Sequence, residues 1–217
     1  MSDLPYRDLL TCFLQTLQMV GLAGAISLGI GLPLALLLVV TDQRGIVPSF
    51  FINRVVGTFA NAVRSVPFII LLVAVIPLTR LIVGTAIGTM AAVVPLAIAA
   101  TPYYARIAEV SLRSVDGGLV EAVRAMGGGR MAIIREVYLP EALPGLIAGF
   151  VVTLVTLIGA SAMAGVVGAG GLGDLAIRYG YDEFQTKVVV AVVAILIAFV
   201  WVLQFAGDHL AAHFDRR

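Results

Sequence analysis

The chain has 217 residues, of which 60% are hydrophobic and 12% are charged, and its formal net charge is +1. Soluble domains carry about 25% charged residues, so this chain has too little charge to cover a water-facing surface and belongs in a membrane. The small net charge gives no support for nucleic acid or an acidic protein as a partner, and the single cysteine, Cys12, excludes an intramolecular disulfide.

Long apolar runs predict an all-α membrane protein that forms one domain over residues 12–206. Crossing the hydrocarbon of a bilayer takes about 20 helical residues, and the runs provide five such helices. The predicted transmembrane helices are residues 18–40, 56–78, 86–104, 142–164 and 188–205. A long polar segment, residues 106–141, separates the third span from the fourth.

Two spans carry small residues four positions apart. Gly21, Ala25 and Gly29 share one face of the first span, and Gly145 and Gly149 share one face of the fourth. Small residues let two membrane helices approach closely. Both sets therefore predict close packing against a neighbouring helix.

The second span is expected to bend, because Pro67 and Pro77 cannot complete a regular helix. Arg64 lies within its cytoplasmic end, and two placements remain open. Its guanidinium can face an internal cavity, or it can reach the lipid headgroups on an extended stem. Apart from Arg64, no predicted span has an ionisable residue in its interior. This composition argues against ion-coupled chemistry within the spans.

The polar segment predicts a compact helical knob on one face of the membrane. A short helix is expected before Gly127, which ends it together with the two glycines that follow. Residues 131–138 can start a second helix. Pro140 and Pro144 are expected to mark the turn into the fourth span.

The basic residues predict which side of the membrane the knob occupies. Cytoplasmic segments of membrane proteins carry an excess of lysine and arginine, and here the excess lies with the polar segment. We therefore expect the knob and the carboxyl terminus inside the cell and the amino terminus outside.

The knob carries a motif by which the chain resembles the permeases of ABC importers. Their cytoplasmic loop reads Glu-Ala-Ala, three residues, Gly, nine residues, Ile, one residue, Leu-Pro. The same spacing is kept here by Glu121, Ala122, Val123, Gly127, Val137, Leu139 and Pro140. Val123 replaces the second alanine of the motif, and Val137 replaces its isoleucine. The resemblance implies that Glu121, Ala122, Gly127 and the Leu139-Pro140 pair couple the spans to a separate ATPase.

Over nearly its whole length the sequence is similar to the permease subunit of bacterial methionine importers, notably at RSVPFIILL, EALPGLI and VGAGGLGDL. The resemblance implies a multi-pass protein of the bacterial inner membrane that transports both D- and L-methionine. It implies two copies of the chain, two ATP-binding subunits and a periplasmic or lipid-anchored methionine-binding protein. The partner ATPase would bind ATP and magnesium, so this chain is expected to hold no cofactor and not to be an enzyme.

Other transport functions remain open alternatives. Permeases for betaine, phosphonate or another amino acid share the knob and a similar glycine loop between the last two spans. A channel or secondary transporter that works without an ATPase is a further alternative.

Motifs for other chemistry are rejected. Gly168, Gly170 and Gly173 match the dinucleotide fingerprint, but that fingerprint needs a preceding strand within a βαβ unit. We interpret these glycines as sites of close backbone packing near the outer gate, where two copies meet. His209 and His213 lie four apart, and we interpret them as a solvated helix end rather than a metal site.

Five residues within or beside the spans are candidates for the lining of a translocation pathway. They are Asn61, Ser65, Tyr103, Ser161 and Met163. Met163, beside the glycine loop, is the candidate outer gate. For each residue the alternative is ordinary helix packing.

Overall fold

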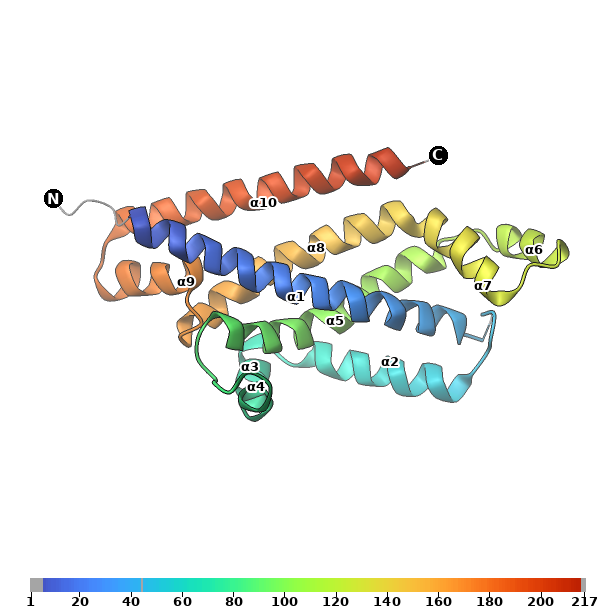
Figure 1. Cartoon of the computed structure of the whole chain (residues 1–217), viewed down its shortest axis with the longest axis horizontal. Coiled ribbons are helices and arrows are strands. Elements are labelled where there is room, and N and C mark those ends of the chain that lie inside the picture. The colour runs from blue at the N-terminus through green and yellow to red at the C-terminus, as the bar shows by residue number, and fades with distance from the viewer. Residues whose placement is uncertain (1–5, 44, 216–217) are drawn as a thin grey trace.

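The computed structural model describes residues 6–43 and 45–215, which form a helical bundle without a strand among them (Figure 1). Its long helices are α1 (Tyr6–Val40), α5 (Thr89–Arg113), α8 (Leu139–Val166) and α10 (Thr186–Phe214). Figure 1 shows that α8 runs opposite to the other three, so that α1 begins at one end of the bundle and α10 finishes at the other.

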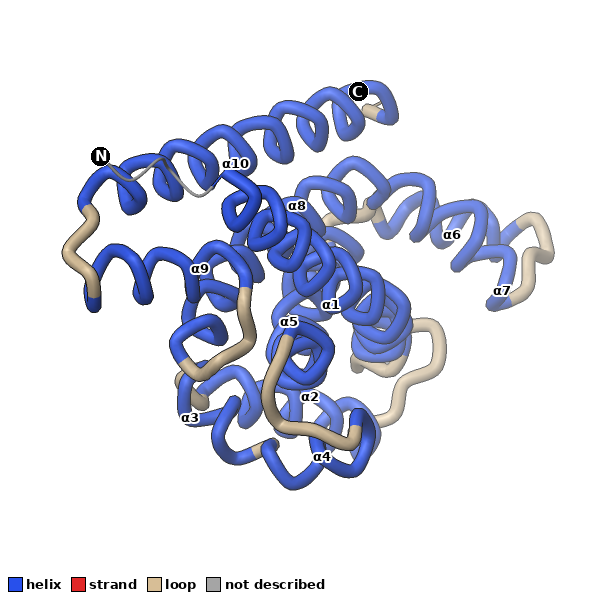
Figure 2. The backbone as a smooth tube through the Cα atoms, turned by 60° about the vertical axis from the view of Figure 1, so that its left-hand side comes forward, coloured by secondary structure: helices blue, strands red, loops and turns tan. Residues whose placement is uncertain are grey.

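Shorter elements connect the long helices. They are α2 (Phe50–Ser65), α3 (Phe68–Ala74), α4 (Ile76–Val83), α6 (Gly117–Ala125), α7 (Arg130–Ala132), the π-helical η1 (Ile133–Tyr138), α9 (Gly171–Leu175) and the π-helical η2 (Ala176–Asp182). In Figure 2, α1 and α5 occupy the middle of the bundle, with α10 on one side and α2, α3 and α4 on the opposite side.

The all-α fold is confirmed, with four or five spans. Four of the described helices are long and apolar enough to cross a membrane, and α2 with α3, bent by 105°, makes five when the pair is counted as one span. Pro67 therefore does more than bend the second span, because α2 stops at Ser65 and α3 starts in a new direction. Proline lacks the N–H that would continue the helical hydrogen-bond ladder.

The predicted turn at Pro140 and Pro144 is wrong. Both prolines lie in a helix that runs without interruption from Arg130 to Val166. The wide turns of η1 end at Tyr138, two residues before Pro140, and local π-helical turns help membrane helices to accommodate proline. The third span is also longer than predicted, because α5 continues to Arg113.

The core of the bundle lies where α1, α5 and α8 meet. Met19 and Ala23 on α1 pack with Leu96 on α5 and with Leu157 on α8, and all four are buried. Gly31 allows an even closer contact, since a Cβ atom there would lie 2.9 Å from the carbonyl oxygen of Thr101. Apolar packing between these three helices holds the spans in register.

The strip of small residues predicted on the first span faces away from this core. Gly21, Ala25 and Gly29 are exposed, and a Cβ atom at either glycine would meet nothing within 4 Å. The close contacts are made instead by Gly24 and Gly31. Spacing identifies a shared helix face, but it does not say which face meets a neighbour within the same chain.

A valine at Gly149 should destabilise the bundle, because a Cβ atom there would collide with the side chain of Ile107 on α5. Overpacking costs about 1–3 kcal/mol, so the purified protein should lose its monodisperse size-exclusion peak at a lower temperature. Gly159→Val is the matched control on α8, since a Cβ atom at Gly159 meets nothing within 4 Å. Equal losses in the two variants would contradict this account of the packing.

Candidate functional site

The knob at one end of the bundle consists of α6, a glycine turn and α7 with η1 (Figure 1). Asp116 caps the start of α6, where its carboxylate accepts a hydrogen bond of 2.7 Å from the amide of Gly118. At the other end Gly127 has a φ of 81°, a left-handed conformation that glycine adopts without strain. The structure thus shows the expected helix, glycine break and second helix.

The knob is anchored to the chain by its inner face. Val120 on α6 and Ile133 and Val137 on η1 are buried together, with Ile46 and Tyr138 packed against them. These apolar contacts fix the position of α6 relative to the end of the fourth span.

The outer face of the knob carries exposed apolar side chains among its polar ones. Leu119, Met126 and Met131 are 43%, 78% and 59% exposed, and Glu121 and Ala122 lie exposed on α6 beside them. An exposed apolar patch with a polar rim is typical of a protein interaction site. Methionine suits such a site because its flexible side chain adapts to the partner.

The five coupling candidates fall into two groups. Glu121, Ala122 and Gly127 lie on the exposed face of α6 or at its end. Leu139 is half-buried against the core between α5 and α8, and Pro140 is exposed in the first turn of α8. The structure brings the first three together and places the Leu-Pro pair at the base, where the knob joins the bundle.

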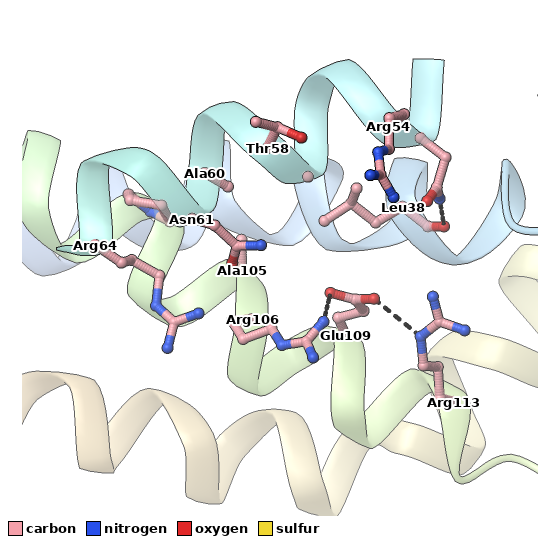
Figure 3. Close-up of a pocket in the computed structure, with 13 residues that line it drawn as sticks. Leu38, Arg54, Thr58, Ala60, Asn61, Arg64, Ala105, Arg106, Glu109 and Arg113 are labelled. Carbon is pink, nitrogen blue, oxygen red and sulfur yellow. Dashed lines mark hydrogen bonds and ion pairs between the residues drawn. The ribbon is translucent and has the colours of Figure 1, made fainter. Parts of the chain in front are cut away.

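A basic groove lies between α2 and α5, next to the same end of the bundle (Figure 3). It has a volume of about 230 Å³, and its charged lining residues are Arg54, Arg64, Arg106, Glu109 and Arg113. Figure 3 shows Arg64 and Arg106 extending into the space below α2. Arginine exceeds carboxylate among these lining residues, so the groove favours an anionic group.

Glu109 is the buried charge in this groove, with 4% of its surface exposed. Its carboxylate accepts hydrogen bonds from Nη1 of Arg106 at 2.8 Å and from Nε of Arg113 at 2.9 Å. Arg113 also pairs with Asp42, just beyond the end of α1. The network ties the ends of α1 and α5 together and leaves Glu109 with paired oxygens, as a buried carboxylate requires.

Our sequence interpretation did not include Glu109, because the third span was expected to end at residue 104. A signal was present in the spacing. Arg106, Glu109 and Arg113 are separated by three and four residues, the distances at which opposite charges pair along one helix. That pattern favours continuation of the helix through the start of the polar segment.

A second pocket, of about 290 Å³, lies between α2, α3, α5 and α8. Phe68, Leu71, Ala100 and Leu157 are among its apolar lining residues. Its polar members include Arg64 and the hydroxyls of Tyr103 and Thr156, which lie 3.4 Å apart. Arg64 is an exposed residue that also lines the basic groove, so it borders both of these open hollows.

The structure separates the pathway candidates by their surroundings. Tyr103 lines the apolar pocket and Asn61 the basic groove. Ser65 is exposed at the end of α2, and Met163 is 53% exposed near the end of α8. Ser161 is only 2% exposed and donates a hydrogen bond of 2.8 Å to the carbonyl of Ile158. This surrounding favours the packing alternative for Ser161.

The glycine segment after α8 packs against the start of α1. Gln15 accepts a hydrogen bond of 2.8 Å from the amide of Gly171, and Thr16 accepts one of 2.9 Å from the amide of Leu172. A Cβ atom at Gly173 would collide with the backbone of Ala162. The close backbone approach expected of these glycines is therefore made within the chain.

Charged groups at this same end of the bundle form a separate cluster. The carboxylate of Asp8 accepts a hydrogen bond of 3.1 Å from the hydroxyl of Tyr179 and raises the pKa of that phenol. Asp174 pairs with Arg178 and raises the pKa of its guanidinium.

Within residues 8–43 and 45–215, no three histidine, cysteine, aspartate or glutamate side chains gather as metal ligands. The ring of His209 packs against that of Phe205, with centroids 4.7 Å apart.

An all-helical bundle with four long apolar helices, one bent helix pair and a projecting helical knob is the architecture of a membrane-spanning protein. Residues 27–217 match the model of the family described as the inner membrane component of binding-protein-dependent transport systems. The chain belongs to this family, as the resemblance of its knob predicted.

Relatives and solved structures of the family extend over nearly the whole chain. A probable D-methionine transport system permease protein MetI from Vibrio cholerae is 49% identical over 96% of this chain and 93% of its own length. The methionine import system permease protein MetP from Bacillus subtilis is 38% identical over 83% of this chain and 82% of its own length. A chain in an inward-facing structure of the MetNI methionine ABC transporter is 45% identical, matches with a TM-score of 0.97 and is covered completely, as is this chain.

Proposed function

We propose that this chain is the permease subunit of an ATP-driven importer for D- and L-methionine. The observation that carries the proposal is the knob, whose exposed apolar face stands at one end of a bundle shared over its full length with a methionine ABC transporter chain. Two copies of the chain form the pathway, and two separate ATP-binding subunits dock on their knobs. A periplasmic or lipid-anchored binding protein delivers methionine to the opposite end.

The knob transmits movement of the ATPase to the fourth span. α7, η1 and α8 form one continuous helix, and the buried contacts of Val120 with Ile133 and Val137 fix α6 to its start. A displacement of α6 therefore moves α8 as a rigid element rather than bending a loop. Met163 lies at the far end of α8 and acts as the outer gate, consistent with rigid-body alternation in transporters.

The basic groove and the apolar pocket form the inner part of the pathway in each copy. Both open beside α5, and Arg64 lines both of them. Tyr103, Asn61 and Ser65 line or border this route, whereas Ser161 supports the packing of α8. In the proposed cycle, the inward-facing conformation opens this route to the cytoplasm.

The proposed function predicts a defined assembly and a substrate-dependent ATPase. The chain should purify as two copies with two ATP-binding subunits, and methionine with the binding protein should stimulate ATP hydrolysis. Betaine and phosphonates should not stimulate it. An active one-to-one complex by native mass spectrometry, or methionine uptake by the purified chain without an ATPase, would exclude the proposal.

Gly127→Val and Glu121→Lys should uncouple the permease from its ATPase. Valine at the φ of 81° found at Gly127 is strained and displaces the end of α6, while lysine reverses the charge of its exposed face. Removing one partner of a desolvated charge pair costs about 2–5 kcal/mol. If docking buries Glu121 against a basic residue of the ATPase, the Glu121→Lys permease should lose most of its association with the ATPase. The measurement is co-purification and stimulated ATP hydrolysis.

Gly129→Val is the matched control for the backbone effect. A Cβ atom at either glycine meets nothing within 4 Å, but Gly129 has a φ of −77°, which valine tolerates. Normal transport by both Gly127→Val and Glu121→Lys, with normal insertion, would show that α6 is not the coupling element.

The orientation has its own prediction, because the excess of basic residues favours a cytoplasmic knob. In a Cys12-free background, an impermeant thiol reagent applied to intact cells should label a cysteine at Asp182 and should not label one at Arg124. Both positions are exposed and lie in different end regions of the bundle. Labelling of the cysteine at Arg124 alone would show that the orientation is the opposite of the one predicted.

A further inference from the structure

The break in the second span lies beside the apolar pocket. α2 ends at Ser65 and α3 begins at Phe68 after a bend of 105°. Val63, Arg64 and Val66 line the pocket from one side of the break, and Phe68 and Leu71 line it from the other. Transporters bind their substrates where membrane helices are interrupted, because irregular backbone is tolerated there only beside protein or a cavity.

The pocket also lies at mid-depth in the bundle. Thr153, one of its lining residues, is at the middle of α8, which runs from Leu139 to Val166. Figure 1 shows the junction of α2 and α3 about halfway along α1 and α8. A cavity of about 290 Å³ at this depth is at the small end of the range for ligand pockets, which suits a solute the size of an amino acid.

Arg64 brings an uncompensated positive charge to this pocket. Among the described residues, no carboxylate lies within ion-pairing distance of its guanidinium, and the nearby Glu109 is engaged by Arg106 and Arg113. An arginine within a membrane span is costly without an anionic partner. The structure therefore offers a place for a carboxylate that the described part of the chain does not fill.

The lining of the pocket combines three kinds of group. It contains the guanidinium of Arg64, the paired hydroxyls of Tyr103 and Thr156, and apolar side chains that include Leu71, Ala100 and Leu157. A guanidinium binds a carboxylate through two parallel hydrogen bonds, and hydroxyl oxygens accept hydrogen bonds from an ammonium group.

We propose that this pocket is a substrate-binding site within each permease copy, specific for a zwitterionic amino acid with an apolar side chain. Arg64 binds the α-carboxylate, the hydroxyls of Tyr103 and Thr156 receive the α-ammonium group, and the apolar wall around Leu157 holds the side chain. This site rests on the proposed function, since it assigns a holding point to the solute that the importer carries.

The test measures protection of a thiol in the pocket by methionine. The complex of this chain with its ATPase subunits carries Ala160→Cys, a residue that lines the pocket, in a Cys12→Ser background, in detergent and without ATP. A water-soluble methanethiosulfonate reagent should label the cysteine more slowly when L-methionine is present. Methionine amide, which lacks the carboxylate, should protect weakly. Ala99→Cys provides a second thiol in the same pocket, should Ala160→Cys fold poorly.

Arg64→Gln should raise the methionine concentration for half-maximal protection by about ten- to a hundredfold, the effect of losing a charge-assisted hydrogen bond. Arg80→Gln is the matched control, because Arg80 is an exposed arginine on α4 that lines neither the pocket nor the basic groove. It should leave protection unchanged. A cysteine at Tyr181, exposed and remote from the pocket, should label at the same rate with and without methionine.

Three outcomes would overturn the proposal. Methionine could fail to protect either pocket thiol, or protection could survive Arg64→Gln. Equal protection by inorganic phosphate would show a general anion site instead, and would also overturn it. Stimulation of ATP hydrolysis by methionine and the binding protein is measured on the same complex. If stimulation occurs without protection, the proposed function stands and only the pocket assignment fails.

Discussion

The close packing of α1 against α5 and α8 is the contact on which the rest of the structure depends. Met19, Ala23, Leu96 and Leu157 are buried where these helices meet, and Gly24 and Gly31 let α1 lie close to its neighbours. In a bilayer there is no hydrophobic gain from helix association, so this fit of small and large side chains must itself hold the helices together. The knob, the groove and the pocket are all attached to this core.

The same core explains why the second span can be broken. The backbone of three regular helices is satisfied internally, and α2, α3 and α4 pack along one side of them. Interrupted backbone is costly when it faces lipid, but here the break lies over a cavity that Arg64 and Tyr103 also line. The interruption and the polar side chains therefore occur at the same depth, and each makes the other less costly.

Much of this architecture follows from the sequence, since 20-residue apolar runs and a fixed spacing in the knob leave few alternatives. Gly127 could be recognised as a helix end because the turn needs a positive φ. Burial within the chain could not be recognised, because Gly21 and Gly24 look alike in sequence and only one of them meets a neighbour. Glu109 was missed because the polar composition after residue 104 was interpreted as a loop, whereas α5 continues as a helix to Arg113.

The π-helical turns of η1 set the direction in which the knob points. A π-helical turn acts as one extra residue within an α-helix, and each residue in an α-helix turns the chain by about 100°. The phase of α6 around the axis of α8 is therefore determined by a local insertion rather than by a flexible hinge. Removing one residue between Ile133 and Tyr138 would leave both helices intact yet swing the apolar face of α6 away from its present direction. Such a chain would keep its spans, but the apolar face of α6 would no longer point in the direction needed for docking.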